Sequence, residues 1–337
     1  MTTWRSIQER QRRRNIYMTK SILGHRTTYK PFDYDWTFKA FQSQNQSHWM
    51  AQEVPIDNDI KDFHFTLTPA EKSLVTQVLR FFTQADLAVS DNYINRLMHH
   101  FHLPEVKMML SAFAAMESVH VDAYAYLSDS LNLDSNNDFY QSFVDIKSMK
   151  DKDDYLNNIE ITDIASLAKC LAIFGGFVEG VQLFSSFAIL NSFPRRGLLK
   201  GVGQIITWSI RDESLHAQCI TKLFREIISE NPSLWNDELK KSLYQACRDC
   251  VKLEDAFIDA CFDMGDIEGL TAASIKKYVR YMADIRLGDL GLKSNYHIKQ
   301  NPLPWLDVLV NGQEMQNFFE GRSTNYSKGT IINDLVR

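Results

Sequence analysis

The chain has 337 residues, of which 45% are hydrophobic and 23% are charged, a balance that is typical of a soluble globular protein. Its formal net charge of -5 excludes the strongly basic character of nucleic-acid-binding proteins, so we expect no nucleic-acid partner. Five cysteines are an odd number in a long chain, which argues against a disulfide framework and favours the cytoplasm. The polar start of the chain does not resemble a secretory signal.

Predicted helices account for most of the chain. The first begins at Thr68, the N-cap of a capping box that Glu71 closes, with Pro69 in the first turn. Apolar periodicity, bounded by Pro and Gly, predicts six long helices, at 69–100, 104–131, 162–190, 198–229, 237–264 and 271–288. The polar segment 134–158 is interpreted as a connection with one short helix. Since no stretch shows the alternation of a strand, we predict an all-α bundle.

One predicted helix needs a membrane test. Residues 171–190 are long and apolar enough to span a bilayer. Glu179 and Gln182 lie near the middle of this stretch, however, and a carboxylate there is costly in lipid. A helix that is apolar on every side is also typical of the centre of a large bundle. We therefore predict a buried core helix and no membrane partner.

Four of the predicted helices place acidic residues on their apolar faces. Asp86 follows Phe82 and precedes Val89 and Tyr93 in a 4-3-4 spacing, which lines one face of a helix. The same kind of apolar spacing surrounds three glutamates on three other helices: Glu117, Glu179 and Glu213. Four ionised carboxylates in one core would cost many kcal/mol without compensation. The pattern therefore calls for bound positive charge.

Two divalent cations would neutralise the four carboxylates. Glu117 and His120 form an ExxH pair, as do Glu213 and His216, and this i, i+3 spacing places both side chains on one helix face. Two ExxH helices, together with a carboxylate from each of two further helices, are the pattern of ferritin-like di-metal bundles. Here Asp86 and Glu179 would supply the two single carboxylates. The sequence thus predicts a dinuclear metal site in a ferritin-like fold with additional helices.

Four segments around these residues resemble the metal-helix motifs of class I ribonucleotide reductase small subunits. They are FFTQAD (81–86), AFAAMESVHVDAY (112–124), FVEGVQLFSSFA (177–188) and RDESLH (211–216). The resemblance extends from about Trp36 to Phe319. It implies that one metal is bound by Asp86, Glu117 and His120, and the other by Glu179, Glu213 and His216. Glu117 and Glu213 would then be the candidates to bridge the two metals.

The same resemblance implies catalytic roles outside the ligand set. Tyr124 lies one helical turn after His120 and would carry a tyrosyl radical. Trp49 would hydrogen-bond Asp212, which is linked to His120, in a route for electrons and protons toward the surface. Tyr326, in the polar tail, would relay the radical to the partner subunit.

The implied activity is that of the small subunit of ribonucleoside-diphosphate reductase, whose radical the large subunit uses to reduce ribonucleotides. The cofactors would be two transition-metal ions per chain, with iron as the first choice and manganese or a mixed pair as alternatives. The implied partners are the large subunit and a second copy of the chain; the sequence leaves open whether a flavoprotein activase is also needed. The sequence has no Gly-rich phosphate loop, which fits a subunit that binds no nucleotide substrate itself.

The chain is divided into an N-terminal arm (1–30), a helical domain (31–318) and a tail for docking on the large subunit (319–337). That tail lacks the aromatic or strongly acidic ending common in the family. Three other functions are alternatives for such a helical bundle. They are a di-metal oxidase or hydroxylase acting on a small molecule, iron storage by a ferritin-like protein, and a purely structural bundle. The first would need no Trp49, Asp212 or Tyr326, and the last leaves the buried acids unexplained.

Overall fold

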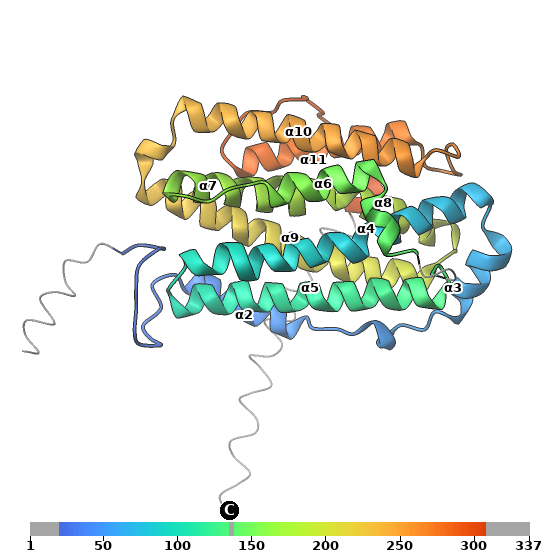
Figure 1. Ribbon diagram of the computed structural model, residues 1–337, viewed down its shortest axis with the longest axis horizontal. Helices are drawn as coiled ribbons and strands as arrows, with labels where there is room; N and C mark the ends of the chain where they lie inside the picture. The colour runs from blue at the N-terminus through green and yellow to red at the C-terminus, as the bar shows by residue number, and fades with distance from the viewer. Residues whose placement is uncertain (1–19, 135–137, 308–337) are drawn as a thin grey trace, which may run out of the picture.

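The computed structural model describes residues 20–134 and 138–307; within these ranges the regular elements are helices joined by loops, and the β-structure is limited to two isolated bridges. Figure 1 shows an elongated bundle whose long helices run along one axis. The long elements are α2 (Asp35–Gln46), α4 (Pro69–Asp91), α5 (Pro104–Ser130), α6 (Lys147–Asn157), α7 (Ile164–Ile173), α8 (Phe184–Ser192), α9 (Lys200–Glu230), α10 (Asp237–Cys261) and α11 (Ala272–Asp289). The predicted all-α fold class is confirmed.

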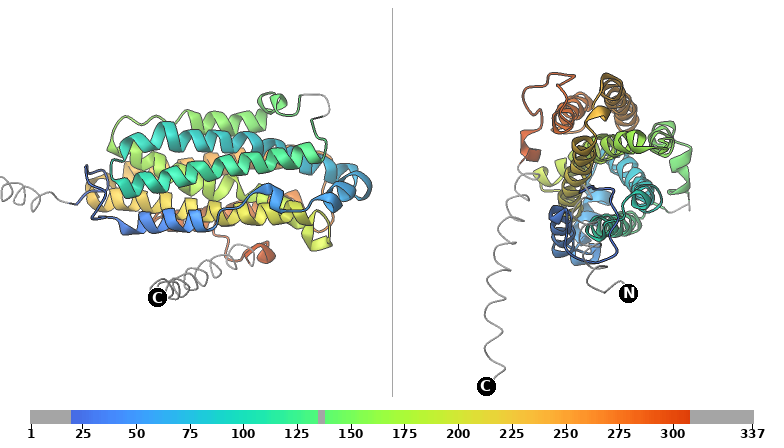
Figure 2. Two further views of the ribbon diagram at one scale, coloured as in Figure 1. Left: turned by 90° about the horizontal axis from the view of Figure 1, so that it is seen from below. Right: turned by 90° about the vertical axis from the view of Figure 1, so that its left-hand side faces the viewer.

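The shorter elements connect or interrupt the long helices. They are η1 (Ala51–Glu53), α3 (Asp57–Lys61), η2 (Asp62–Thr66), η3 (Asn92–Leu97), η4 (Met98–His100), η5 (Gln141–Val144), η6 (Phe174–Gln182), η7 (Pro194–Arg196) and η8 (Pro232–Leu234). Three of them, η2, η3 and η6, are π-helical. An end-on view shows α4, α5 and α9 around the centre of the bundle, with α10 and α11 packed outside (Figure 2).

The start of α4 follows the sequence prediction. The Thr68 hydroxyl accepts from the backbone N–H of Glu71, and the Glu71 carboxylate accepts from the backbone N–H of Thr68 at 2.8 Å. The predicted helix to residue 100 is a regular α-helix only as far as Asp91. The α-helix ends at Asp91 and continues as π-helical η3 and 3₁₀-helical η4.

Helix α2 was not predicted from the sequence. Its buried positions are Thr37, Ala40 and Gln44, which follow helical spacing but include only one apolar residue. A periodicity read from hydrophobic residues alone passes over such a helix. The omission matters because α2 packs against α5 and α9 and brings a buried amide to the centre of the bundle.

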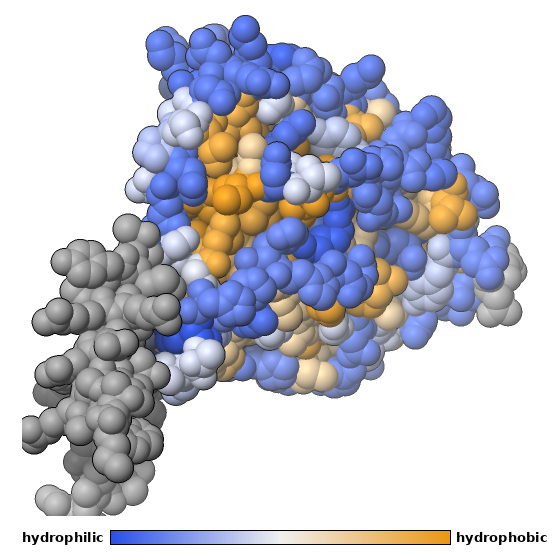
Figure 3. All heavy atoms as spheres, turned by 60° about the vertical axis from the view of Figure 1, so that its left-hand side comes forward, coloured by the Kyte–Doolittle hydropathy of each residue, from blue (hydrophilic) through white to orange (hydrophobic). Residues whose placement is uncertain are grey.

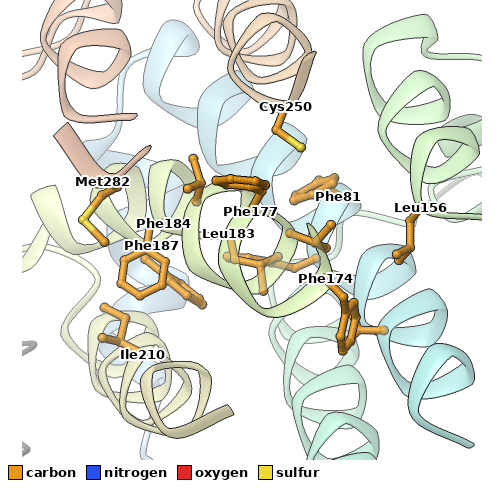
Figure 4. Packing of buried hydrophobic residues seen from close by; sticks show 14 of the residues in the cluster. Phe81, Leu156, Phe174, Phe177, Leu183, Phe184, Phe187, Ile210, Cys250 and Met282 are labelled. Atoms are coloured by element: carbon orange, nitrogen blue, oxygen red, sulfur yellow. The ribbon is translucent and has the colours of Figure 1, made fainter. Parts of the chain in front are cut away.

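The predicted core helix is confirmed as buried, although it is not one regular α-helix. The stretch Ile164–Arg196 is long and apolar enough to cross a membrane, yet every residue from Cys170 to Phe193 is buried within the bundle. It consists of α7, the π-helical η6 and α8. Figure 4 shows side chains of this stretch, such as Phe177 and Phe187, packed among side chains from other helices, such as Phe81 and Ile210.

The core also holds one buried ion pair. Lys152 Nζ lies 2.7 Å from Glu254 and 3.7 Å from the centre of the Phe81 ring, so charge and ring faces both stabilise the ammonium group. All five cysteines are free and buried, as expected for a chain without a disulfide framework. Figure 3 shows that one end of the molecule also gathers apolar residues at its surface, among hydrophilic neighbours.

The segment 20–34 fastens the bundle at one end. The backbone N–H of Ile22 and the hydroxyls of Ser21 and Tyr34 donate to the carboxylate of Glu230, at the end of α9. Farther along the same segment, Arg26 donates to Glu105, in the first turn of α5, at 2.7 Å. The segment therefore ties the start of α5 to the end of α9.

Candidate metal centre

Six side chains from four separate segments converge at the centre of the bundle. Asp86 comes from α4, Glu117 and His120 from α5, Glu179 from η6, and Glu213 and His216 from α9. They form two groups, each with its candidate ligand atoms within 4.8 Å of one another: Asp86, Glu117, His120 and Glu213 in the first, and Glu117, Glu179, Glu213 and His216 in the second. All six residues are buried. We call these groups position 1 and position 2.

Each histidine turns its Nδ1 atom toward the carboxylates. In position 1, Nδ1 of His120 lies 3.3 Å from Glu117, 3.2 Å from Glu213 and 3.7 Å from Asp86. In position 2, Nδ1 of His216 lies 2.8 Å from Glu117, 3.8 Å from Glu213 and 3.9 Å from Glu179. Glu117 and Glu213 therefore contact both imidazoles, which is the arrangement expected of two bridging carboxylates.

The polar atoms that face the centre lack well-formed hydrogen bonds to the described residues. These atoms are Asp86 Oδ1, both carboxylate oxygens of Glu117 and Glu213, Glu179 Oε2, and the Nδ1 atoms of His120 and His216. Buried polar groups are ordinarily hydrogen-bonded, and a cluster of exceptions needs an explanation. Oxygen and imidazole nitrogen atoms are suitable ligands for transition metals, so the orphaned atoms fit two bound cations.

The pKa values of the clustered carboxylates also favour bound cations. Burial, followed by the negative charges of Glu117 and Glu213, holds the pKa of Asp86 well above its usual range. Burial and the same two neighbours also raise the pKa of Glu179, and burial raises that of Glu213 to about 7. Three of the four adjacent carboxylates thus resist ionisation without cations. Two divalent ions would remove this penalty.

Close contact between η6 and α9 brings the ligands of position 2 together. A Cβ atom on Gly175, in η6, would lie 2.7 Å from Cβ of Ile220, in α9, so only glycine fits at this contact. Glu179 lies one turn after Gly175, and His216 lies one turn before Ile220. Since the two segments run in opposite directions, the Gly175–Ile220 contact places Glu179 beside His216.

A second layer of hydrogen bonds orients both histidines. Trp49 Nε1 donates to Asp212 Oδ2 at 2.8 Å, and that same oxygen lies 3.4 Å from Nε2 of His120. The predicted contacts among these three residues are therefore present. Carboxylate partners of this kind fix the tautomer of a metal-binding histidine and leave Nδ1 free for the ion.

Gln44, on the unpredicted helix α2, contacts His216 in the way that Asp212 contacts His120. Its Oε1 atom lies 2.9 Å from Nε2 of His216, and its Nε2 donates to Asp212 Oδ1 at 3.1 Å. The amide thus joins the two histidine networks through one side chain. The available signal was a glutamine at a position where helical spacing from Thr37 and Ala40 predicts burial.

Tyr124 lies beside position 1 in an apolar enclosure. Its ring stacks on Phe82 with the centroids 4.6 Å apart, and its centroid is 6.3 Å from that of His120. The side chain is fully buried, and its hydroxyl makes no well-formed hydrogen bond within the described residues. Burial and the charge of Asp86 hold the pKa of this phenol well above its usual range. Tyr326 lies outside the described residues.

A comparison with protein families decides the affiliation of the chain. The family described as ribonucleotide reductase, small chain, matches residues 26–302, most of the sequence. The chain belongs to this family. The sequence resemblance is thereby confirmed, and the ligand motifs lie within the matched region.

Curated relatives of this small chain cover nearly its whole length. It is 38% identical over 95% of its length to a probable ribonucleoside-diphosphate reductase small subunit of Invertebrate iridescent virus 3, with 89% of that protein covered. It is 29% identical over 88% of its length to a ribonucleoside-diphosphate reductase subunit beta of Chlamydia pneumoniae, again with 88% of the relative covered. The small chain is therefore similar to viral and bacterial reductase subunits along its entire helical region.

Solved structures support the fold of the small chain. A ribonucleotide reductase R2 subunit from Clostridium botulinum superposes with a TM-score of 0.79 at 22% identity, covering 87% of this chain and 94% of the other. A dimanganese(II) NrdF protein from Streptococcus sanguinis gives a TM-score of 0.73 at 21% identity, covering 81% and 94%. These likenesses confirm the predicted ferritin-like bundle with additional helices.

Proposed function

We propose that this small chain generates and stores a tyrosyl radical on Tyr124 for use by the large subunit of ribonucleoside-diphosphate reductase. The observation that carries the proposal is a fully buried phenol next to a cluster of orphaned ligand atoms. Family membership supplies the overall reaction, the reduction of ribonucleotides to deoxyribonucleotides. The roles of the individual residues are our assignment.

Asp86, Glu117 and His120 would hold one metal ion, and Glu179, Glu213 and His216 the other, with Glu117 and Glu213 shared. When bound and oxidised by dioxygen, or by an oxidant derived from it, the metal pair would supply a strong one-electron oxidant. The oxygen-rich donor set suits iron and manganese alike. We propose iron as the first choice, and the likeness to a dimanganese protein supports manganese or a mixed pair as the alternative.

The surroundings of Tyr124 suit long storage of a radical. Loss of one electron and the phenolic proton leaves a neutral radical, which needs no counter-charge in an apolar core. Phe82 covers one ring face, and Phe187 packs against Phe82 with the centroids 5.1 Å apart. Water and soluble reductants are thereby kept away from the ring.

A hydrogen-bonded chain leads outward from position 1. His120, Asp212 and Trp49 follow one another through contacts of 3.4 and 2.8 Å, and the Trp208 ring lies 5.2 Å from that of Trp49. Asp212 keeps its negative charge, because its bonds to His120 and Arg211 outweigh the effect of burial and lower its pKa. We propose this chain as the path of electrons and protons between the metals and the surface.

The partners follow from the same proposal. The large subunit would bind the tail at 319–337, where Tyr326 would relay the radical; this tail lies outside the described residues. A homodimer is supported by large apolar side chains left exposed, among them Leu87 and Ile94. A flavoprotein activase and a cytoplasmic location complete the proposal.

The test is electron paramagnetic resonance of the metal-loaded, oxidised full-length chain. We expect a tyrosyl signal from the wild type and its loss in Tyr124→Phe. Tyr278→Phe is a matched control, because this residue is another buried tyrosine but lies on α11, outside both metal groups. Persistence of the wild-type signal in Tyr124→Phe would show that another residue carries the radical.

A further inference from the structure

A second buried phenol lies on the opposite side of the metal cluster. Tyr93 is fully buried, and its ring centroid is 6.0 Å from that of His216. Tyr124 holds a comparable place beside His120, with the centroids 6.3 Å apart. Each metal position therefore has its own tyrosine. The proposed function uses only one of them.

The two phenols differ in their hydrogen bonding. Tyr93 donates its hydroxyl proton to Oε1 of Glu179 at 2.5 Å, a short bond between a phenol and a carboxylate. The other oxygen of the same carboxylate, Oε2, has no hydrogen-bond partner among the described residues. Glu179 is therefore held with one oxygen occupied and one oxygen available.

The backbone is distorted at both ends of this bond. Tyr93 lies in π-helical η3, where α4 would otherwise have continued, and Glu179 lies in π-helical η6. Single π-helical turns occur often at functional sites, since the added residue redirects side chains. Phe174, also in η6, contacts the Tyr93 ring edge-on at 5.0 Å and fixes its position.

We propose that Tyr93 is a positioning residue for position 2, which holds the carboxylate of Glu179 in place as a metal ligand. The phenol fixes Oε1, which lies 3.9 Å from Nδ1 of His216, and Oε2 has no hydrogen-bond partner among the described residues. The inference rests on the proposed metal-binding function. It also makes the two positions different. Asp86, the corresponding carboxylate of position 1, accepts no hydrogen bond from a phenol among the described residues.

The consequence concerns metal affinity. Removal of a hydrogen-bond partner of a metal ligand ordinarily weakens binding by about 10- to 100-fold. Tyr93→Phe keeps the ring and its contacts with Phe174 but deletes the donor. We expect about a tenfold loss of affinity at position 2 and an unchanged affinity at position 1.

The experiment is a titration of metal-free, full-length protein with Mn²⁺, followed by electron paramagnetic resonance, which distinguishes an isolated ion from a coupled pair. In the wild type, a second equivalent should produce the coupled pair. In Tyr93→Phe, the isolated-ion signal should persist to about tenfold higher free Mn²⁺. Tyr278→Phe, a buried tyrosine that belongs to neither metal group, should behave as the wild type.

A double-mutant cycle assigns the effect to Glu179. In a Glu179→Ala background, Tyr93→Phe should cause no further loss, because the phenol has lost the carboxylate through which it acts. An equal loss in both backgrounds, or equal losses at both positions, would overturn the positioning role. A wild-type protein that never forms a coupled pair would contradict the proposed function itself. A normal wild-type pair with unchanged affinities in Tyr93→Phe would overturn only the inference about Tyr93.

Discussion

Glu117 has the most connected position of the candidate ligands. One of its oxygens lies 3.3 Å from His120 and the other lies 2.8 Å from His216, so the carboxylate spans both metal positions. His120 and His216 together hold the pKa of Glu117 at about 2, although burial alone would raise it. A permanently charged bridging group is what two adjacent cations require.

Glu117→Ala should therefore impair metal loading at both positions. Asp86→Ala is the matched comparison, because Asp86 belongs to position 1 alone, and it should leave one ion bound. Metal analysis of each variant after dialysis against a weak chelator measures the stoichiometry. Two ions retained by Glu117→Ala would contradict the bridging assignment.

At the residue scale the sequence predicted which candidate ligands converge. Acidic residues on apolar helical faces are rare and expensive, so Asp86 and Glu179 were conspicuous. Gln44 and the pairing of Tyr93 with Glu179 were not predicted. An amide or a phenol at a buried position resembles an ordinary core residue, and only the three-dimensional arrangement shows which partner it has.

Among the helices, the start of α4 combines two stabilising features. Glu71 accepts from the backbone of Thr68 and also lies 2.6 Å from Arg196, in η7. Burial alone would raise the pKa of Glu71, but these two donors lower it below its ordinary value of 4.5. A depressed carboxylate pKa stabilises the folded state above the ordinary pKa, and this contribution disappears as pH falls through the lowered pKa.

Glu71→Gln should accordingly lower the free energy of unfolding by about 1 kcal/mol at neutral pH, since it replaces a charged acceptor by a neutral one. The difference from the wild type should shrink as the pH falls below 4.5. Urea unfolding across this pH range is the measurement. Glu268→Gln is the control, because Glu268 faces the same Arg196 at 3.4 Å but its side chain is 83% exposed. A pH-independent deficit in Glu71→Gln would contradict the electrostatic explanation.

The existence and order of the long helices could be predicted from periodicity and capping, whereas their interruptions could not. The sequence around Glu179 contains Gly175, Gly176 and Gly180 and reads as one apolar helix. Gly175 in η6 lies against Ile220 in α9, a neighbour that a single segment does not reveal. Local sequence therefore predicted the helix but neither this close approach nor the π-helical turn.

For the molecule as a whole, the metal centre is expected to contribute to stability. Ligands come from α4, α5, η6 and α9, so bound ions connect four segments that are distant in sequence. Any ligand that binds only the folded state stabilises it, by about 2.7 kcal/mol at a free concentration of 100 times Kd.

Metal-free protein should therefore unfold at a lower temperature than metal-loaded protein, and the melting temperature should rise with free metal concentration. Differential scanning calorimetry of both forms provides the measurement. Glu117→Ala is the control variant, for which the added metal should have little effect. An identical melting temperature for loaded and metal-free wild type would show that the ions do not bind the folded state preferentially.

The segment 20–34 has a consequence for this centre, because it joins the two ExxH helices at their ends. Glu105 lies twelve residues before Glu117, about 18 Å along α5 at 1.5 Å per residue. Glu230 is similarly remote from Glu213 on α9. A slide of one residue between these helices would shift one ExxH pair by about 1.5 Å relative to the other, enough to spoil a shared ligand set. The segment 20–34 thus holds the ends of α5 and α9 in a fixed alignment. A cut in its exposed loop near Tyr29 should therefore loosen the alignment of the two ExxH pairs, although the loop lies far from the metal centre.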